Sequence, residues 1–381
     1  MNFSYYVPTK IFFGPNSLDN LATIKLPEGK ALIVTGGTST TKLGYVDRAK
    51  KLLQQAGREV IIYDKVQPNP TVESVREASK IVRENKCSFI VGLGGGSSLD
   101  AAKAIAIMST NDGDLWDYIG SGSGLGNPIQ NMPLPMIAIT TTAGTGTEAD
   151  PWMVITNGKE KIGFGDFDMT FPLYSIVDPT LMTSIPAHLT AYQGFDALFH
   201  SLEGYIATTA NPISDMFALE AIRLVGKYLP IAVKTPDDIE ARGYVALANT
   251  YSGFVESLSS CTSEHSIEHA LSGFHYDLPH GAGLIMLSKA YFKYFNNIVP
   301  DRMATMANAL GNKDGDIVTA LANLQEVCGV ADLKMSDFGI KKELFAEYAQ
   351  HAKVDMPGLF AVDRCDLTQE DIIAILEQSF R

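Results

Sequence analysis

The chain contains no closely spaced pair of cysteines. Its four cysteines, Cys87, Cys261, Cys328 and Cys365, are far apart and form no Cys-x-x-Cys motif. This spacing argues against a disulfide framework and a cysteine-based zinc site, and it indicates free thiols in a reducing compartment. The N-terminus also lacks the basic segment and apolar run of a secretory signal. We therefore expect a cytoplasmic protein.

Positive charge and long apolar runs are scarce as well. The 381 residues include 30 Lys and Arg against 43 Asp and Glu, which gives a formal net charge of −13. An acidic surface repels nucleic acid and anionic membranes. The longest apolar stretches, such as 136–139 and 284–287, fall far short of the ~20 residues that a membrane span requires. We expect neither a nucleic-acid partner nor membrane association.

The length and the apolar patterning predict two globular domains. The chain exceeds the roughly 250–300 residues at which a single hydrophobic core stops growing. Up to about residue 180, short apolar runs alternate with longer helical patterns, which is typical of a parallel sheet covered on both faces. The predicted strands are 31–35, 59–63, 88–92 and 136–140. Beyond them, helix-spaced apolar residues continue to the C-terminus. The sequence thus predicts an α/β domain at 1–180 and an all-helical domain at 181–381.

Three loops rich in glycine, serine and threonine follow three of these strands. Glycine lets a phosphate approach the backbone, and the N–H groups at the start of a helix carry partial positive charge. Because the carboxyl ends of parallel strands meet at one edge of a sheet, we expect the loops to converge on a binding site for a dinucleotide or another phosphorylated ligand. The loops are Gly36-Gly-Thr-Ser-Thr-Thr41, Gly92-Leu-Gly-Gly-Gly-Ser-Ser-Leu-Asp100, which opens a helix predicted at 99–108, and Thr140-Thr-Thr-Ala-Gly-Thr-Gly-Thr-Glu148.

Each loop alone also fits an ordinary turn without a ligand. The dinucleotide fingerprint G-x-G-x-x-G does not follow the first strand. Asp64, at the end of the second strand, has the position of a ribose ligand but fits a solvated strand-end carboxylate better. The convergence of the three loops is therefore the stronger signal.

Histidines are concentrated in the second half of the chain, where residues 265–280 alone contain four. Residues four apart project from one face of a helix. Two predicted helices carry such pairs, Asp196 with His200 and His265 with His269. His280 lies in a predicted turn, Pro279-His-Gly. One carboxylate and several imidazoles suit Fe²⁺, Zn²⁺ or a similar divalent ion, so the spacing predicts a metal site without separating ligands from neighbouring histidines.

A second interpretation of the same histidines is a zinc protease. His265-Ser-Ile-Glu-His269 matches the H-x-x-E-H motif, in which Glu268 would be the general base. Glu343 or Glu347 would then supply a third ligand. This alternative leaves the three glycine-rich loops without a role.

Several blocks of the sequence resemble the iron-containing (group III) alcohol dehydrogenases. A single block is modestly specific, whereas the set in this order is highly specific. The resemblance implies a nucleotide-binding α/β domain with a parallel sheet, followed by an all-helical metal-binding domain, an architecture shared with dehydroquinate synthase. The blocks are Gly94-Gly-Gly-Ser-Ser-Leu-Asp-Ala-Ala-Lys103, Thr141-Thr-Ala-Gly-Thr-Gly-Thr-Glu148, Asp178-Pro179, Gly194-Phe-Asp-Ala-Leu-Phe-His-Ser-Leu-Glu-Gly-Tyr205, and His265-x-x-x-His269 with Pro279-His-Gly281.

The resemblance also implies roles for individual residues. The metal ligands would be Asp196, His200, His265 and His280, while His269 matches a catalytic histidine of the family that is not a ligand. The residues expected at the cofactor, from the resemblance or from the loops themselves, are Gly36, Gly37, Thr38, Ser39, Gly94, Gly95, Gly96, Ser97, Asp100, Thr141, Thr142, Thr145 and Lys161.

The implied reaction is the interconversion of a small primary alcohol and its aldehyde by hydride transfer, with NAD(P) as cofactor and Fe²⁺, or Zn²⁺ in its place, as the metal. A glycerol- or other polyol-type dehydrogenase of the same superfamily is the alternative. The family is commonly oligomeric, and we expect a homodimer.

One departure from the family concerns the choice of cofactor. Members that prefer NAD often carry an Asp just after the first strand, where its charge repels a 2′-phosphate. Here that place is taken by glycine, at Gly36 and Gly37, with donors nearby at Thr38 and Ser39 and with Lys42 beyond. We therefore predict that NADP(H) is preferred over NAD(H).

Overall fold

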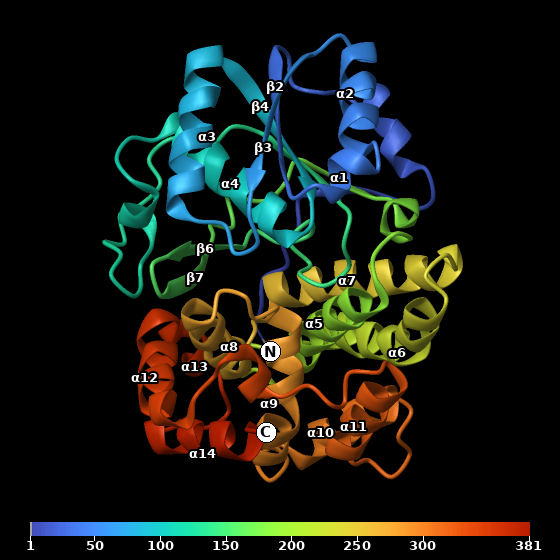
Figure 1. The fold of residues 1–381 in the computed structure, drawn as a ribbon, viewed down its shortest axis with the longest axis vertical. Coiled ribbons are helices and arrows are strands. Elements are labelled where there is room, and N and C mark those ends of the chain that lie inside the picture. The colour runs from blue at the N-terminus through green and yellow to red at the C-terminus, as the bar shows by residue number, and fades with distance from the viewer. Residues whose placement is uncertain (1) are drawn as a thin grey trace.

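The structure, a computed structural model, describes residues 2–381. A parallel sheet with its helices forms one half of the molecule, and helices alone form the other (Figure 1). The sheet has six strands in the order β3-β2-β4-β5-β8-β1, and every neighbouring pair is parallel. The strands are β1 (Lys10–Phe13), β2 (Lys30–Gly36), β3 (Glu59–Val66), β4 (Cys87–Gly94), β5 (Met136–Thr140) and β8 (Tyr174–Val177).

Helices cover both faces of this sheet. In β2, Leu32 and Val34 point into a core shared with α3 and α4, whereas Ala31 and Ile33 point into a core shared with α2. A sheet buried on both sides needs nearly continuous apolar strands, which is the pattern the sequence shows. The helices of this half are α1 (Ser39–Lys42), α2 (Tyr45–Gln55), α3 (Val72–Asn85) and α4 (Gly96–Thr110), with the 3-10 turns η1 (Ser17–Ala22) and η2 (Leu115–Tyr118).

The second half consists of helices packed around one large core. None of the helices within residues 2–381 is long and apolar enough to cross a membrane. The predicted fold class, a parallel α/β half followed by an all-helical half, is confirmed. The helices are α5 (Ala187–Ile206), α6 (Pro212–Lys234), α7 (Ile239–Leu258), α8 (Ser263–Phe274), α9 (His280–Phe295), α10 (Pro300–Ala309), α11 (Ile317–Val327), α12 (Phe345–Asp355), α13 (Pro357–Ala361) and α14 (Gln369–Ser379), with the 3-10 turns η3 (Pro179–Met182), η4 (Met335–Phe338) and η5 (Lys342–Leu344).

Asp178 lies where the chain leaves the sheet and enters the helical half. Its buried carboxylate accepts hydrogen bonds from the backbone of Asn16 and Leu18 at 3.0 and 3.3 Å, and it also caps η3 through the N–H of Thr180. The sheet ends at Val177, just before this residue. We propose, as the sequence predicts, that the domains divide near residue 180 into 1–180 and 181–381.

Four strands were not predicted from the sequence, because each has only four or five residues. The strands β1 and β8 have four residues each, and β6 (Met153–Asn157) and β7 (Glu160–Phe164) form a separate antiparallel hairpin of five-residue strands. Such short strands carry too few alternations to stand out from loops. In Figure 1 this hairpin lies between the sheet and the helical half.

Two helix starts also differ from the prediction. The helix expected at 99–108 begins earlier, at Gly96. Glycine has a low helix propensity, so the sequence pattern did not reveal that the backbone is already helical at this residue. His280 was expected in a turn, and it is instead the first residue of α9, directly after Pro279. Both differences place a predicted site residue at a helix N-terminus.

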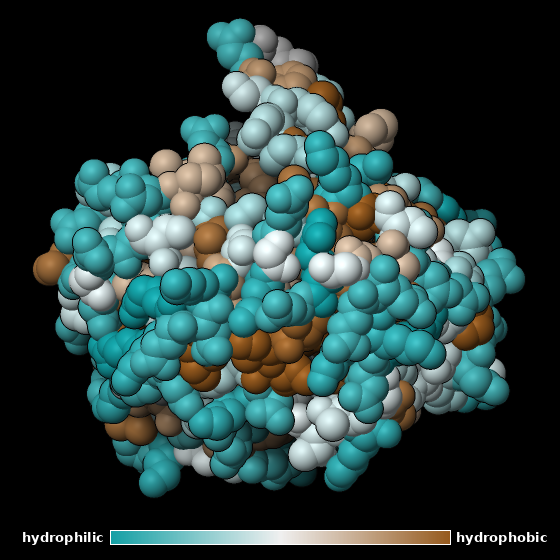
Figure 2. All heavy atoms as spheres, turned by 90° about the horizontal axis from the view of Figure 1, so that it is seen from above, coloured by the Kyte–Doolittle hydropathy of each residue, from teal (hydrophilic) through white to brown (hydrophobic). Residues whose placement is uncertain are grey.

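The face of the molecule seen from above is mostly polar (Figure 2). Hydrophilic residues cover most of this face, and apolar residues form patches of limited extent between them.

Candidate metal and cofactor site

A cavity of about 700 Å³ lies between the two halves of the molecule. The glycine-rich turn contributes Gly96 and Ser97, and the loop after β5 contributes Thr145. The β6–β7 hairpin adds Lys161. On the facing wall are five residues that the sequence singled out, Asp196, His200, His265, His269 and His280. The glycine-rich turn and the histidine cluster thus border the same space.

Three imidazoles converge on the carboxylate of Asp196. The Nε2 atoms of His200, His265 and His280 lie 3.8, 3.6 and 3.4 Å from Asp196 Oδ1. Asp196 and His200 come from α5, His265 from α8 and His280 from the start of α9. Ligand atoms of a tetrahedral ion lie about 3.4 Å apart when each is about 2.1 Å from the metal. The spacing of this quartet therefore matches a divalent metal site.

The hydrogen bonding of the quartet also suits a divalent cation. Asp196 Oδ1 and His265 Nε2 are buried, and neither has a hydrogen-bond partner within residues 2–381. Buried polar atoms are normally satisfied, so a pair left without partners on facing groups needs a ligand. One carboxylate oxygen and three imidazole nitrogens are a donor set that Fe²⁺ and Zn²⁺ both accept.

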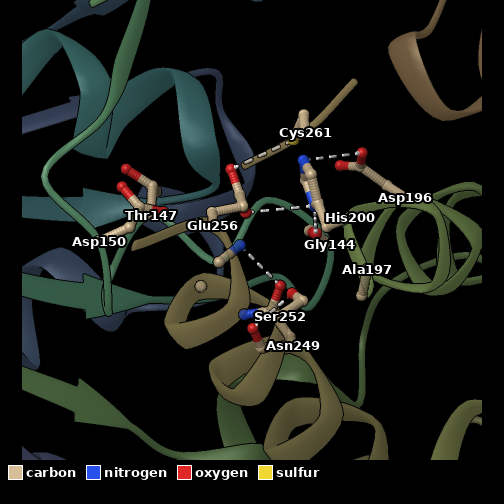
Figure 3. Close-up of polar contacts among 12 residues, drawn as sticks. Gly144, Thr147, Asp150, Asp196, Ala197, His200, Asn249, Ser252, Glu256 and Cys261 are labelled. Carbon is tan, nitrogen blue, oxygen red and sulfur yellow. Dashed lines mark hydrogen bonds and ion pairs between the residues drawn. The ribbon is translucent and has the colours of Figure 1, made fainter. Parts of the chain in front are cut away.

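Each of the three imidazoles faces Asp196 with its Nε2 atom and contacts a protein acceptor through its Nδ1 atom. His265 Nδ1 bonds to Glu203, and His280 Nδ1 bonds to Glu268. His200 Nδ1 donates to the carbonyl of Gly144 at 3.2 Å and lies 3.5 Å from Glu256 Oε1 (Figure 3). A proton fixed on Nδ1 leaves the Nε2 lone pair free, which is how metal-binding histidines are oriented.

The electrostatics of the cavity favour neutral imidazoles at two positions. Burial lowers the pKa of His200 to about 3. Burial, with a contribution from the charge of Lys161, also holds the pKa of His269 well below its usual value. A metal ligand has to be deprotonated, so His200 is ready to bind an ion at neutral pH. Burial and the nearby Asp150 raise the pKa of Glu256 well above its usual range.

Removing the carboxylates behind the imidazoles is expected to weaken the metal site. Glu268→Gln or Glu203→Gln replaces a charged acceptor by an amide, which orients the imidazole less firmly and lowers its basicity. We expect each change to reduce metal affinity roughly 10–100-fold, measured by competition with a chromophoric chelator.

The surface residue Glu347 provides a matched control, since its carboxylate pairs only with Lys159, at 3.1 Å and partly exposed. Glu347→Gln should leave metal affinity unchanged. Unchanged affinity in the Glu203 and Glu268 variants as well would show that these contacts do not support the site.

The loop after β4 and the loop after β5 are packed against each other at the sheet edge. A Cβ on Gly95 would lie 3.0 Å from the side chain of Thr142, and one on Gly96 would lie 2.5 Å from that of Thr145. The N–H of Thr141 donates to the carbonyl of Gly94 at 2.9 Å. Only glycine fits this approach, which leaves the first turn of α4 open to the cavity. The turn has the form of a phosphate cradle.

Two further predicted cofactor residues are engaged with protein partners. Asp100 accepts hydrogen bonds from Thr147 Oγ1 at 2.8 Å and from the N–H of Val154 at 3.0 Å, so it ties the loop after β5 to the hairpin. Lys161 donates to Ser272 Oγ at 2.9 Å and lies 3.7 Å from Glu268 Oε2. Both border the cavity, but their polar groups already have partners.

The first glycine-rich loop lies at the same sheet edge but does not border the cavity. Gly36 ends β2, which pairs with β4, and residues 37–39 are exposed. Helices change sides between these two strands, with α2 on one face and α4 on the other. Dinucleotides bind at such a switch point, with their far end beyond the catalytic cavity. The loop is therefore exposed at the switch point of the sheet, outside the cavity.

His269 differs from the quartet in its surroundings. Its ring centre lies 5.1 Å from that of His280, and its Nδ1 lies 2.9 Å from Met356 Sδ. No bond to a carboxylate fixes this ring, which faces the cavity beside the ligand group. Geometry alone keeps it near enough to be a ligand, because Glu268, His269 and His280 form a second group of close donor atoms.

The structure does not support the protease alternative. Glu268 is fully buried and bonds to His280, so it is not free to activate water. Glu343 is exposed, and Glu347 pairs with Lys159 at the surface. Neither provides a third ligand for His265 and His269.

Sequence reasoning missed the acidic partners of the imidazoles. Glu203 follows Asp196 by seven residues and therefore lies on the same face of α5, a signal that helical spacing contains. Glu256 and Cys261, which also border the cavity, have no such signal, because they come from α7 and the segment after it and meet the histidines only in the fold.

Comparison with known proteins identifies the family. Residues 8–179 match the family described as iron-containing alcohol dehydrogenase, and residues 190–380 match the C-terminal part of the Fe-containing alcohol dehydrogenase family. The chain is 36% identical over 390 residues to a 1,3-propanediol dehydrogenase of Klebsiella pneumoniae, covering 99% of each chain. It is 35% identical over 385 residues to alcohol dehydrogenase 4 of Schizosaccharomyces pombe, covering 99% of this chain and 89% of the relative.

The fold agrees with these matches. An archaeal halo-thermophilic alcohol dehydrogenase from a Red Sea brine pool superposes with a TM-score of 0.94 at 34% identity, over 100% of this chain and 99% of that one. Both halves of the chain, the order of its motifs and its fold lead to the same conclusion. The protein belongs to the iron-containing alcohol dehydrogenase family and is an oxidoreductase that acts on alcohols.

Proposed function

We propose that this enzyme interconverts a small primary alcohol and its aldehyde by hydride transfer, with NAD(P) as cofactor and Fe²⁺ as the metal. The observation that carries the proposal is the common cavity, which has the glycine-rich turn on one wall and the Asp196 quartet on the other. The names of the relatives, a 1,3-propanediol dehydrogenase and an alcohol dehydrogenase, support a small alcohol as substrate.

In this proposal Asp196, His200, His265 and His280 hold the ion. When bound, the ion supplies Lewis-acid stabilisation of the negative charge that develops on the substrate oxygen. Asp196 contributes the single ligand charge, and the neutral imidazoles leave the net charge of the site positive. Since this chemistry requires no change in oxidation state of the metal, Zn²⁺ would serve in place of Fe²⁺.

The cofactor is held by the sheet half. The turn Gly95–Ser97 and the start of α4 would bind the pyrophosphate, with Gly94, Thr141, Thr142 and Thr145 beside it. Asp100 and Lys161 act by positioning the loop and the hairpin, since their polar groups have protein partners. The nicotinamide, when bound, supplies the hydride acceptor or donor.

His269 would move the proton. Oxidation of an alcohol releases a proton from the substrate hydroxyl, and a neutral imidazole facing the cavity is able to accept it. The lowered pKa of His269 keeps the ring neutral at pH 7. Because Met356 Sδ contacts Nδ1, the Nε2 atom is the one that we propose as the acceptor.

The proposal is tested by measuring metal content and nicotinamide reduction together. Purified protein, reconstituted with Fe²⁺ or Zn²⁺, is assayed at 340 nm with primary alcohols of two to six carbons. We expect activity that scales with bound metal and disappears on chelation. Full activity in the metal-free protein, or no alcohol oxidised with either cofactor, would contradict it.

We further propose a preference for NADP(H), which rests on the first glycine-rich loop. A Cβ on Gly36 would lie 2.0 Å from the carbonyl oxygen of Val66, so only position 37, which is open, has room for a carboxylate. Gly37, Thr38 and Ser39 are exposed and offer donors to a 2′-phosphate, and Lys42 follows on α1.

We expect kcat/KM to be higher with NADP⁺ than with NAD⁺, and Gly37→Asp to reverse this order by charge repulsion of the 2′-phosphate. The comparison uses both cofactors at a fixed alcohol concentration. Gly44→Asp, in the open turn before α2, is a control for added charge. A strong preference of the unchanged protein for NAD⁺ would contradict this proposal.

A homodimer and a cytoplasmic location complete the proposal. The strand β1 is an edge of the sheet, and aromatic residues around it are exposed by 42–53%, namely Phe3, Tyr5, Tyr6 and Phe13. Edge strands and exposed aromatic groups of this kind are commonly covered by a second copy of the chain. The four cysteines are free thiols, which supports a reducing compartment.

A further inference from the structure

The metal end of the cavity has an unusually polar wall. Glu256, Ser260 and Cys261 border the cavity directly beside His200 and His265. In Figure 3, the carboxyl group of Glu256 lies between His200 on one side and Asp150 with Thr147 on the other, with Cys261 next to it. None of these side chains belongs to the Asp196 quartet, and the Nδ1 proton of His200, 3.5 Å from Glu256, is donated to the Gly144 carbonyl. A pocket for a simple alkanol would be lined here by apolar groups.

The carboxyl group of Glu256 has no strong hydrogen-bond donor. Its Oε1 atom is buried without a partner in the described chain, since His200 Nδ1, at 3.5 Å, donates to Gly144. The contact of Oε2 is the thiol of Cys261 at 3.8 Å, which is a weak donor. A buried carboxyl oxygen without a hydrogen-bond donor lowers the stability of the folded protein. A hydrogen bond donated by a bound molecule would therefore be favourable.

The cations nearest to this wall are already paired. Lys103 donates to Thr147 Oγ1 at 2.7 Å and to the carbonyl of Trp152 at 2.6 Å, and it pairs with Asp150. Lys161 is bound to Ser272 and Glu268. Neither lysine is therefore free to turn toward Glu256.

We propose that Glu256 binds a second hydrogen-bond donor on the substrate, so that the enzyme prefers alcohols carrying another hydroxyl or an ammonium group over simple alkanols. This inference rests on the proposed alcohol–aldehyde chemistry. The reacting hydroxyl faces the Asp196 quartet, and a second donor two or three carbons away reaches the neighbouring carboxyl group. A simple alkanol leaves that group unsatisfied, and sites built for a substrate donor reject analogues that lack it.

Matched substrates test this preference. The measurement is the ratio of kcat/KM for propane-1,3-diol to that for propan-1-ol, with 3-aminopropan-1-ol as a second arm that separates an ammonium from a hydroxyl group. We expect a ratio of about ten or more for at least one arm, the gain from one hydrogen bond to a buried carboxyl group. A ratio near one in both arms, with propan-1-ol oxidised normally, overturns the inference while leaving the proposed function intact.

Variants of Glu256 tie the preference to this residue. Glu256→Leu should bring the ratio close to one through loss of activity on the bifunctional alcohol, with the bound metal unchanged by elemental analysis. Glu256→Gln keeps an acceptor oxygen and should retain the preference for the diol while losing any preference for the amino alcohol. If either variant lowers kcat/KM equally for all three substrates, Glu256 does not recognise a second donor.

Two measurements keep the test independent of folding and of turnover. Ser257→Ala changes the next residue of α7, whose hydroxyl donates to the Gly253 carbonyl within the helix, and should leave the ratio unchanged. Thermal shift of the metal-loaded protein should increase more with propane-1,3-diol than with propan-1-ol at equal concentration. The same difference should be absent in the leucine variant, and its persistence there would contradict the inference.

Discussion

Replacing His280 with alanine is expected to abolish metal binding and alcohol oxidation together. His280 is one of three imidazoles aimed at Asp196 Oδ1, and it is the first residue of α9. Loss of one ligand of four leaves an incomplete site, and the Lewis acid contributes several kcal/mol to such a reaction. We expect kcat/KM to fall on the order of 10³-fold or more, with metal content measured by elemental analysis.

His188→Ala is the matched control for this change. His188 is an exposed residue of α5 whose ring centre lies 5.8 Å from that of Tyr192. Its replacement should alter neither metal content nor activity. If the His280 variant loses its metal but keeps full activity, the metal has no part in the reaction. If it keeps both, His280 is not a ligand.

Replacing His269 with alanine is expected to slow turnover while the metal stays bound. The ring borders the cavity and its Nδ1 contacts Met356, and its lowered pKa keeps it neutral before the substrate proton is released. Removal of a general base typically costs roughly 10²–10⁴-fold in rate. The effect should fall on kcat at saturating alcohol, and one equivalent of metal per chain should remain.

Two outcomes would contradict this role for His269. Loss of the metal in the alanine variant would make His269 a ligand, which the second group of donor atoms around Glu268 and His280 allows geometrically. Unchanged kcat would show that the proton leaves by another route. Added imidazole restoring part of the rate would in turn identify the missing ring as the proton acceptor.

The histidine cluster illustrates how far local spacing reaches in this protein. Asp196 with His200, and His265 with His269, were paired by helical periodicity, and both pairs do project into the cavity. The spacing of residues predicts which side chains share one face of a helix, but it does not predict which faces of different helices pack against each other. The separation of His269 from the ligands therefore came from resemblance to the family, and we propose it for this chain because the Nδ1 of His269 contacts Met356.

The glycine-rich loops were predictable for a different reason. Parallel strands end at one edge, so the loops after β2, β4 and β5 had to gather there once the sheet was recognised. The β6–β7 hairpin was not predictable, because its two strands have only five residues each. The hairpin places Lys161 against Ser272, and this contact could therefore not be predicted from the sequence.

The exposure of the quartet has a consequence for how long the enzyme stays loaded. Asp196, His200 and His265 are buried, whereas the side chain of His280 is 23% exposed on the cavity side. His280 borders the cavity in which the proposed nicotinamide would bind. We therefore expect a bound nicotinamide to slow the release of the proposed ion.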